Sequence, residues 1–216
     1  MIIVGAKGFA KEVLEVQYQL NDVGEIYFYD DVSKHSEDLL FGKYRILRCL
    51  DEVNEVIKLS SDKRFTLGVG GSYLRYKLHL KFQSAGLIFS STISPFAHVG
   101  NYEVEICEGV NLMTGSVLTN SIHVGKGSLI NLNCTVGHDT IIGEFVEISP
   151  GVHISGNCKI GSFTSIGTNA AVLPKLRIGS NSIIGAGTVV TKDVPDNVLV
   201  VGVPGKIVKR LPKQMA

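Results

Sequence analysis

Residues 133–143 read NCTVGHDTIIG and place His138 directly before Asp139. A neutral imidazole, with a reference pKa of about 6.5, can accept a proton near neutral pH. A carboxylate on the other ring nitrogen would fix the tautomer and stabilise the imidazolium. Adjacent side chains of an extended strand point apart, so such a pair requires a bent backbone. Two interpretations stay open at this point, a general base at a turn or a solvated surface histidine; His98, His123 and His153 are assigned to the surface.

The pair lies inside a repeat of six residues. Neither a helix nor an alternating strand has this period. A small or β-branched residue follows most of the repeated aliphatic positions after four residues, and glycine often follows directly. Such a repeat is typical of a parallel β-helix, in which inward side chains stack from coil to coil. With three hexads per triangular turn, we expect five coils, and His138 and Asp139 facing outward. The aliphatic positions are Ile106, Leu112, Leu118, Val124, Ile130, Val136, Ile142, Ile148, Ile154, Ile160, Ile166, Val172, Ile178, Ile184 and Val190.

The first ninety residues follow a different pattern, in which strand-like and helix-like segments alternate. The segments MIIVGA, EIYFYDD and FTLGVG are strand-like, whereas GFAKEVLEVQYQL and SYLRYKLHLKFQSAG are helix-like. This alternation predicts a small α/β domain of Rossmann-like type with a parallel sheet. Ligands are expected beyond the carboxyl ends of its strands, in the loops after Val4, Phe28 and Val69. We therefore expect two domains, residues 1–92 and residues 93–216.

The first of these loops has the composition of a phosphate site. Gly5, Ala6, Lys7, Gly8 and Phe9 follow a strand and open a helix, the context in which backbone amides hold a phosphate. The full G-x-G-x-x-G pattern is absent, so the loop taken alone is a weak signal.

Acidic residues end the second strand of the same domain. Asp30 and Asp31 stand where an acid would meet a ribose or a base edge, although two acids after a strand can also form a polar turn.

Composition excludes several classes of function. The net charge is +1, so no strong field of one sign attracts nucleic acid or an anionic membrane. The four cysteines show no CxxC spacing, which favours free thiols in a reducing cytoplasm. No apolar run approaches the about 20 residues that cross a bilayer, and no ligand cluster with metal spacing is evident. We expect a cytoplasmic protein without membrane insertion, nucleic-acid partner or metal.

The hexads, the opening GAKGFAKEV and the closing VVGVPGKIVKR together resemble the sialic acid O-acetyltransferase and UDP-4-amino-sugar N-acetyltransferase family. The resemblance covers essentially the whole chain. It implies a left-handed parallel β-helix behind the α/β domain. It also implies acetyl-CoA as cosubstrate, a nucleotide-linked 4-amino sugar as acceptor in bacterial glycan synthesis, and a homotrimer with active sites between subunits.

The resemblance also implies roles for single residues. His138 takes the place of the general base, with Asp139 as its partner. Asp30 and Asp31 match the pair that contacts the nucleobase, and Gly156 matches the residue whose amide holds the thioester oxygen. Other positions line the acetyl-CoA groove or stand where relatives often have histidine, near the thioester or the sugar. The groove positions are Asn131, Thr168 and Ala186; the histidine positions are Glu147 and Phe9; Lys192, Lys206 and Lys209 are candidates for the CoA phosphates.

Two alternatives to N-acetylation stay open. The same fold could transfer the acetyl group to a sugar hydroxyl, as in sialic acid O-acetylation. A non-catalytic sugar-nucleotide-binding protein is the other, since Phe9 and Glu147 depart from the histidines of relatives. The segment between Asp31 and Tyr44 is expected to influence the choice of acceptor.

Overall fold

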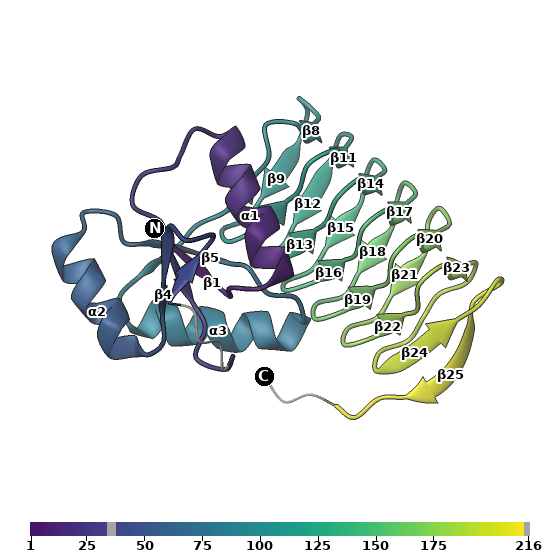
Figure 1. Cartoon of the computed structure of the whole chain (residues 1–216). Helices are drawn as coiled ribbons and strands as arrows, with labels where there is room; N and C mark the ends of the chain where they lie inside the picture. The colour runs from purple at the N-terminus through teal and green to yellow at the C-terminus, as the bar shows by residue number, and fades with distance from the viewer. Residues whose placement is uncertain (34–37, 214–216) are drawn as a thin grey trace.

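The structure is a computed structural model that describes residues 1–33 and 38–213. It consists of an α/β unit packed against one side of a long stack of coils (Figure 1). None of the described helices is both long and apolar enough to cross a membrane.

The α/β unit contains a six-stranded sheet, counted among the described residues, in the order β3-β4-β2-β1-β5-β6. All neighbours pair in parallel except β3 and β4. The three strands and two helices that the sequence predicted are present, together with β3, β4, β6 and α2. The elements are β1 (Ile2–Val4), α1 (Gly8–Gln19), β2 (Tyr27–Tyr29), β3 (Leu39–Leu40), β4 (Tyr44–Leu47), α2 (Leu50–Leu59), β5 (Arg64–Leu67), α3 (Ser72–Ser84) and β6 (Ile88–Phe89).

Three further sheets form the sides of the coil stack in the described part of the chain. The first sheet contains β7 (Thr92–Ile93), β10 (Asn111–Leu112), β13 (Leu129–Ile130), β16 (Glu147–Ile148), β19 (Ser165–Ile166), β22 (Ile183–Ile184), β24 (Val198–Val201) and the antiparallel β25 (Lys206–Arg210). The second contains β8 (His98–Val99), β11 (Val117–Leu118), β14 (Thr135–Val136), β17 (His153–Ile154), β20 (Ala171–Val172) and β23 (Val189–Val190). The third contains β9 (Val104–Ile106), β12 (Ile122–Val124), β15 (Ile141–Ile142), β18 (Lys159–Ile160) and β21 (Arg177–Ile178).

The hexad explains this architecture. The repeated aliphatic residues from Leu112 to Val190 are buried and form one continuous core along the stack. Each turn contains a residue with positive φ, for which asparagine, aspartate and glycine are suited, as at Asn133, Asn157 and Asn169. Strand partners lie 18 residues apart, so three hexads form one coil as predicted. The fold is the predicted parallel β-helix.

The coil begins earlier than the sequence repeat suggests. β7 and β8 form part of a coil ahead of Ile106. The sequence repeat does not reveal this coil, because the step from Val99 to Ile106 is seven residues and breaks the count of six. The boundary predicted between residues 92 and 93 falls inside β7. A division of the chain into two independent domains stays a prediction.

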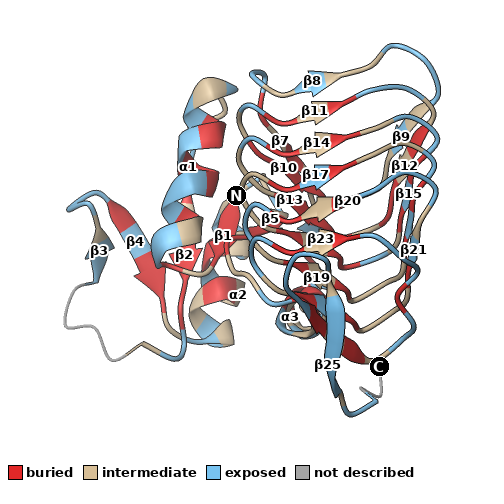
Figure 2. Ribbon diagram, turned by 90° about the vertical axis from the view of Figure 1, so that its right-hand side faces the viewer, coloured by how far each residue is buried: buried red, intermediate tan, exposed pale blue. Residues whose placement is uncertain are grey.

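The α/β unit is joined to the first sheet by buried polar and aromatic contacts. Arg75 of α3 is fully buried and donates hydrogen bonds to the carbonyl of Gly127 and to Oδ1 of Asn111. Burial lowers the pKa of Arg75 to about 10, although the nearby charge of Glu147 opposes this shift. Phe145, from a turn of the coil, packs inside the aromatic core of the α/β unit. Figure 2 shows the buried strands of the two parts meeting along this junction.

Candidate active site

A pocket of about 490 Å³ lies at the carboxyl ends of β1, β2 and β5. Six of the seven residues that the sequence predicted for substrate binding line it; Gly8 lines a neighbouring hollow of about 280 Å³ instead. The sequence did not predict Tyr29, Leu74 or Leu78 as lining residues. The two leucines belong to a segment that the sequence analysis describes only as helix-like. The six are Gly5, Ala6, Lys7, Phe9, Asp30 and Asp31.

The loop after β1 approaches the sheet closely. Gly5 has φ +116°, and a Cβ there would lie 2.7 Å from the carbonyl oxygen of Gly68, so only glycine fits. A Cβ on Gly68 would in turn lie 2.7 Å from the Cβ of the buried Ala10. The role of the third glycine in a dinucleotide loop, close packing of helix on strand, is thus shared by Ala10 and Gly68. α1 begins at Gly8, and its N-terminal end lies beside the pocket, which Lys7 and Phe9 line.

Both aspartates of the pocket are fixed by hydrogen bonds. Oδ1 of Asp30 accepts from the amides of Val32 at 3.1 Å and Ser33 at 2.9 Å. Oδ2 of Asp31 accepts from the Tyr29 hydroxyl at 2.8 Å and from Nζ of Lys81 at 2.7 Å.

Burial would raise the pKa of each aspartate, but these hydrogen bonds outweigh burial and hold both pKa values below the ordinary range. The wall of the pocket therefore carries two ionised acceptors at pH 7. In the segment between Asp31 and Tyr44, residues 34–37 lie outside the described residues.

His138 and Asp139 form a pair on the corner between β14 and β15. Nδ1 of His138 lies 2.6 Å from Oδ2 of Asp139, and both side chains are more than half exposed. The pairing is possible because Asp139 has φ +56°, the bend that adjacent residues require. A carboxylate beside Nδ1 favours the tautomer that carries its proton on Nδ1, in which Nε2 can accept a proton.

Gly156 lies under the ring of His138, one coil further along. A Cβ on Gly156 would lie 2.7 Å from Nε2 and 2.8 Å from Cε1 of His138. The absence of a side chain at Gly156 therefore makes room for the imidazole.

The residues predicted for acetyl-CoA lie elsewhere on the coil. Asn131, Thr168 and Ala186 follow strands of the first sheet and lie on the corner between the first and second sheets. Thr168 and Ala186 are exposed, and Asn131 is half-buried. Glu147 stands on β16, where its carboxylate accepts a hydrogen bond of 2.6 Å from the amide of Gly71 beside the pocket.

The pocket and His138 lie on opposite sides of the chain. The α/β unit covers the first sheet, as the contacts of Arg75 with Gly127 and of Gly71 with Glu147 show. His138 lies on the corner between the second and third sheets, which in a triangular coil is opposite the first. A single chain therefore does not bring the pocket to the histidine.

Two family descriptions match the chain. Residues 1–82 match the PglD N-terminal domain, and residues 157–192 match the bacterial transferase hexapeptide of six repeats. No curated protein sequence matches at a significant level.

Several solved structures resemble almost the whole chain. WeeI from Acinetobacter baumannii is 34% identical with a TM-score of 0.86, covering 96% of this chain and 100% of its own. The acetyltransferase domain of PglB from Neisseria gonorrhoeae, in complex with acetyl coenzyme A, is 30% identical with a TM-score of 0.83, covering 96% and 98%. The chain belongs to the UDP-4-amino-sugar N-acetyltransferase family. A variant of perosamine N-acetyltransferase from Caulobacter crescentus, in complex with CoA and GDP-perosamine, is 29% identical with a TM-score of 0.87, covering 96% of both chains.

Membership of the N-acetyltransferase family confirms the resemblance drawn from the hexads and from the GAKGFAKEV opening. It also confirms that this chain combines an α/β domain with a hexapeptide-repeat β-helix. The catalytic and ligand-binding roles of single residues stay predictions in this family member.

Proposed function

We propose that this protein is an acetyl-CoA-dependent N-acetyltransferase that acts on the amino group of a nucleotide-linked 4-amino sugar in bacterial glycan synthesis. The observation that carries the proposal is the pocket at the strand ends of a PglD-type domain, in a chain whose coil also presents an imidazole–carboxylate pair. Relatives of similar length were solved with CoA and GDP-perosamine or with acetyl coenzyme A. The predicted cytoplasmic location stays part of this proposal.

The pair fits the demands of acyl transfer. The amine attacks the thioester carbonyl, a bond forms between nitrogen and carbon, and the carbonyl oxygen gains negative charge. His138 accepts the proton that the nitrogen sheds, at Nε2, while Asp139 holds Nδ1. When the C–S bond breaks, the CoA sulfur leaves as a thiolate, and the imidazolium can return the proton to it. The amide of Gly156, directly below the ring, is suited to the thioester oxygen.

The site is completed by a second copy of the chain in this proposal. The pocket lies on the side of the first sheet and His138 on the opposite corner, so the acceptor of one subunit would meet the histidine of its neighbour. The homotrimer that the family implies provides such an interface. Asn131, Thr168 and Ala186 would line the acetyl-CoA groove between the subunits. Sedimentation at micromolar concentration should show trimers, and a monomer would contradict this arrangement.

The test is the release of free thiol from acetyl-CoA with a panel of nucleotide-linked 4-amino sugars and with sialic acid. We expect release with an amino sugar and a fall of kcat in His138→Ala by a factor of about 10²–10⁴, the scale of general base catalysis. His153→Ala is the matched control, because His153 is also an exposed histidine on the coil and bonds only Thr135 among the described residues.

The other outcomes distinguish the alternatives. Release with sialic acid alone would make the protein an O-acetyltransferase. Tight binding of a nucleotide sugar without thioester cleavage would support the non-catalytic binding protein. Equal activity of His138→Ala and the wild type would refute the role of His138 as base.

A further inference from the structure

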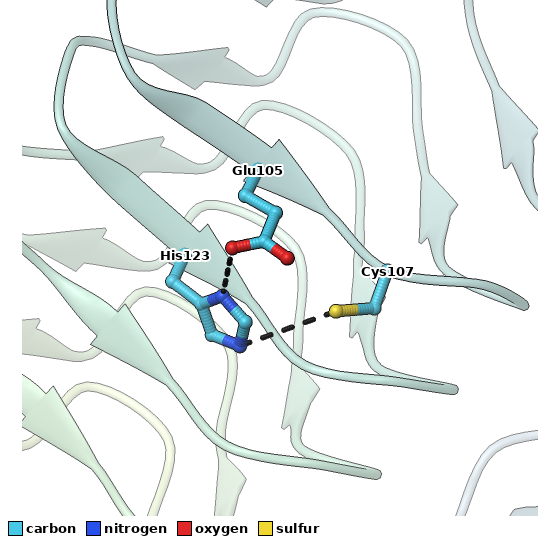
Figure 3. Close-up of side chains that lie close together, drawn as sticks. All are labelled: Glu105, Cys107 and His123. Carbon is cyan, nitrogen blue, oxygen red and sulfur yellow. Dashed lines mark hydrogen bonds and ion pairs between the residues drawn. The ribbon is translucent and has the colours of Figure 1, made fainter.

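Three side chains with metal-binding atoms meet on the outer face of the third sheet. Glu105 on β9 and His123 on β12 pair across the sheet, and Cys107 directly follows β9 (Figure 3). Oε2 of Glu105 lies 3.0 Å from Nδ1 of His123, and Sγ of Cys107 lies 4.0 Å from Nε2. Spacing along the chain did not reveal this group, because Glu105 and His123 are 18 residues apart and only the coil stacks them.

The arrangement resembles an activated thiol, but its charges oppose that function. Burial raises the pKa of Cys107, and the carboxylates of Glu105, Glu144 and Glu108 raise it further. A nucleophilic cysteine needs the reverse, a positive environment that favours the thiolate. Glu108 is paired with Lys126 at 2.6 Å. The cluster itself brings a thiol, an imidazole and a carboxylate together. A divalent cation would reverse the electrostatics and favour the thiolate.

We propose that Glu105, Cys107 and His123 form a zinc site. Thiolate, imidazole and carboxylate are the ligands that zinc takes, and three protein ligands leave a fourth position for water. One candidate atom from each residue lies within 4.8 Å of the other two. Zinc–ligand distances of about 2.0–2.3 Å place tetrahedral ligand atoms about 3.3–3.6 Å apart. The ligand atoms need to approach by little more than about 1 Å, and the partly exposed side chains can rotate that far.

The position of the site indicates a structural role. β9 is the terminal strand of the third sheet and pairs only with β12 among the described strands. Zinc bound by Glu105, Cys107 and His123 would link this end coil to the next coil. This link would not involve the corner that carries His138. Because the thiol and imidazole must lose protons to bind, zinc affinity should rise with pH.

The test uses the full chain, freed of metal with a chelator and titrated with zinc chloride by calorimetry. We expect one zinc per chain and an affinity reduced about a hundredfold or more in Cys107→Ser and His123→Gln. Cys49→Ser is the matched control, because Cys49 is the exposed free cysteine and the buried Cys134 cannot compete. Cobalt should give a thiolate-to-cobalt charge-transfer band in the wild type and in the control, but not in Cys107→Ser.

A second readout protects the test against misfolded variants. Zinc should raise the melting temperature of the wild type and of Cys49→Ser, and leave that of folded Cys107→Ser and His123→Gln unchanged. Failure of the wild type to bind zinc, or wild-type affinity in Cys107→Ser, would overturn the proposal. Rapid alkylation of Cys107 at pH 7 in the presence of chelator, without zinc uptake, would overturn it in favour of an activated thiol.

Discussion

Replacement of Gly156 by alanine tests whether the position of the His138 ring matters for activity. The added Cβ would lie 2.7 Å from Nε2 of His138, against an ordinary contact of about 3.5 Å. The ring must therefore retreat by roughly 0.8 Å, which it can do because its side chain is 63% exposed. A displacement of about 1 Å costs about a hundredfold in rate. We expect kcat of Gly156→Ala to fall by about that factor.

The thiol-release assay should separate this effect from other causes. Alanine keeps the backbone amide of Gly156. If Gly156 contributed to catalysis only through that amide, the variant would therefore stay active. In the His138→Ala background, Gly156→Ala should cost nothing more, because two changes that act through one group are not additive. Gly24→Ala is the control, since a Cβ at Gly24 meets no atom within 4 Å.

Two results would refute the reasoning. Full activity of Gly156→Ala would show that the ring position is not critical for the base. A further hundredfold fall in the double variant would show that the Cβ acts on the acetyl donor rather than on His138.

Three further predictions concern charges elsewhere in the chain. Glu147→Ala should raise KM for the nucleotide sugar about tenfold, because the 2.6 Å bond to the Gly71 amide supports the pocket loop; a change in the acetyl-CoA KM alone would contradict this. Burial lowers the pKa of His79 to about 4, so stability should fall as pH drops from about 6.5 towards 4, by up to about 3 kcal/mol, and His79→Phe should flatten this dependence in urea unfolding. Hydrogen bonds from Arg64 hold the pKa of Asp62 well below its usual range, so their stabilisation should be present above about pH 4 and be lost in stronger acid. Asp62→Asn should cost about 1 kcal/mol at pH 7, and equal unfolding curves for variant and wild type would contradict it.

The β-helix could be predicted because its period is written into every hexad. Each inward aliphatic residue contacts the equivalent residues of neighbouring coils, so local sequence and global fold carry the same signal. The strand at Ile2–Val4 and the helix at Gly8–Gln19 were predictable for the same reason, from continuous patterns. Leu50–Leu59 was missed, although it has acids in its first turn and Lys58 in its last.

The contacts of Glu147 with Gly71 and of Gly156 with His138 could not be derived from the sequence. The first depends on how the α/β unit docks, and the second on the height of one coil above another. Arg75 shows the same limit: in a helix pattern it looks like a solvated charge, whereas five of its hydrogen bonds end on buried or half-buried oxygens.

The stacked coils also restrict how this enzyme can change its geometry. Neighbouring strands of a sheet lie about 4.8 Å apart, so inserting or deleting a coil between the docked α/β unit and residue 138 would shift the histidine along the axis in steps of that size. A shift of one residue would instead turn the inward side chains out of the core. The seven-residue step after Val99 does not have this effect on the other coils, because it lies at the end of the stack. The position of His138 along the coil axis can therefore change only by whole coils. Adaptation to larger or smaller acceptors has to occur in the loops of the pocket.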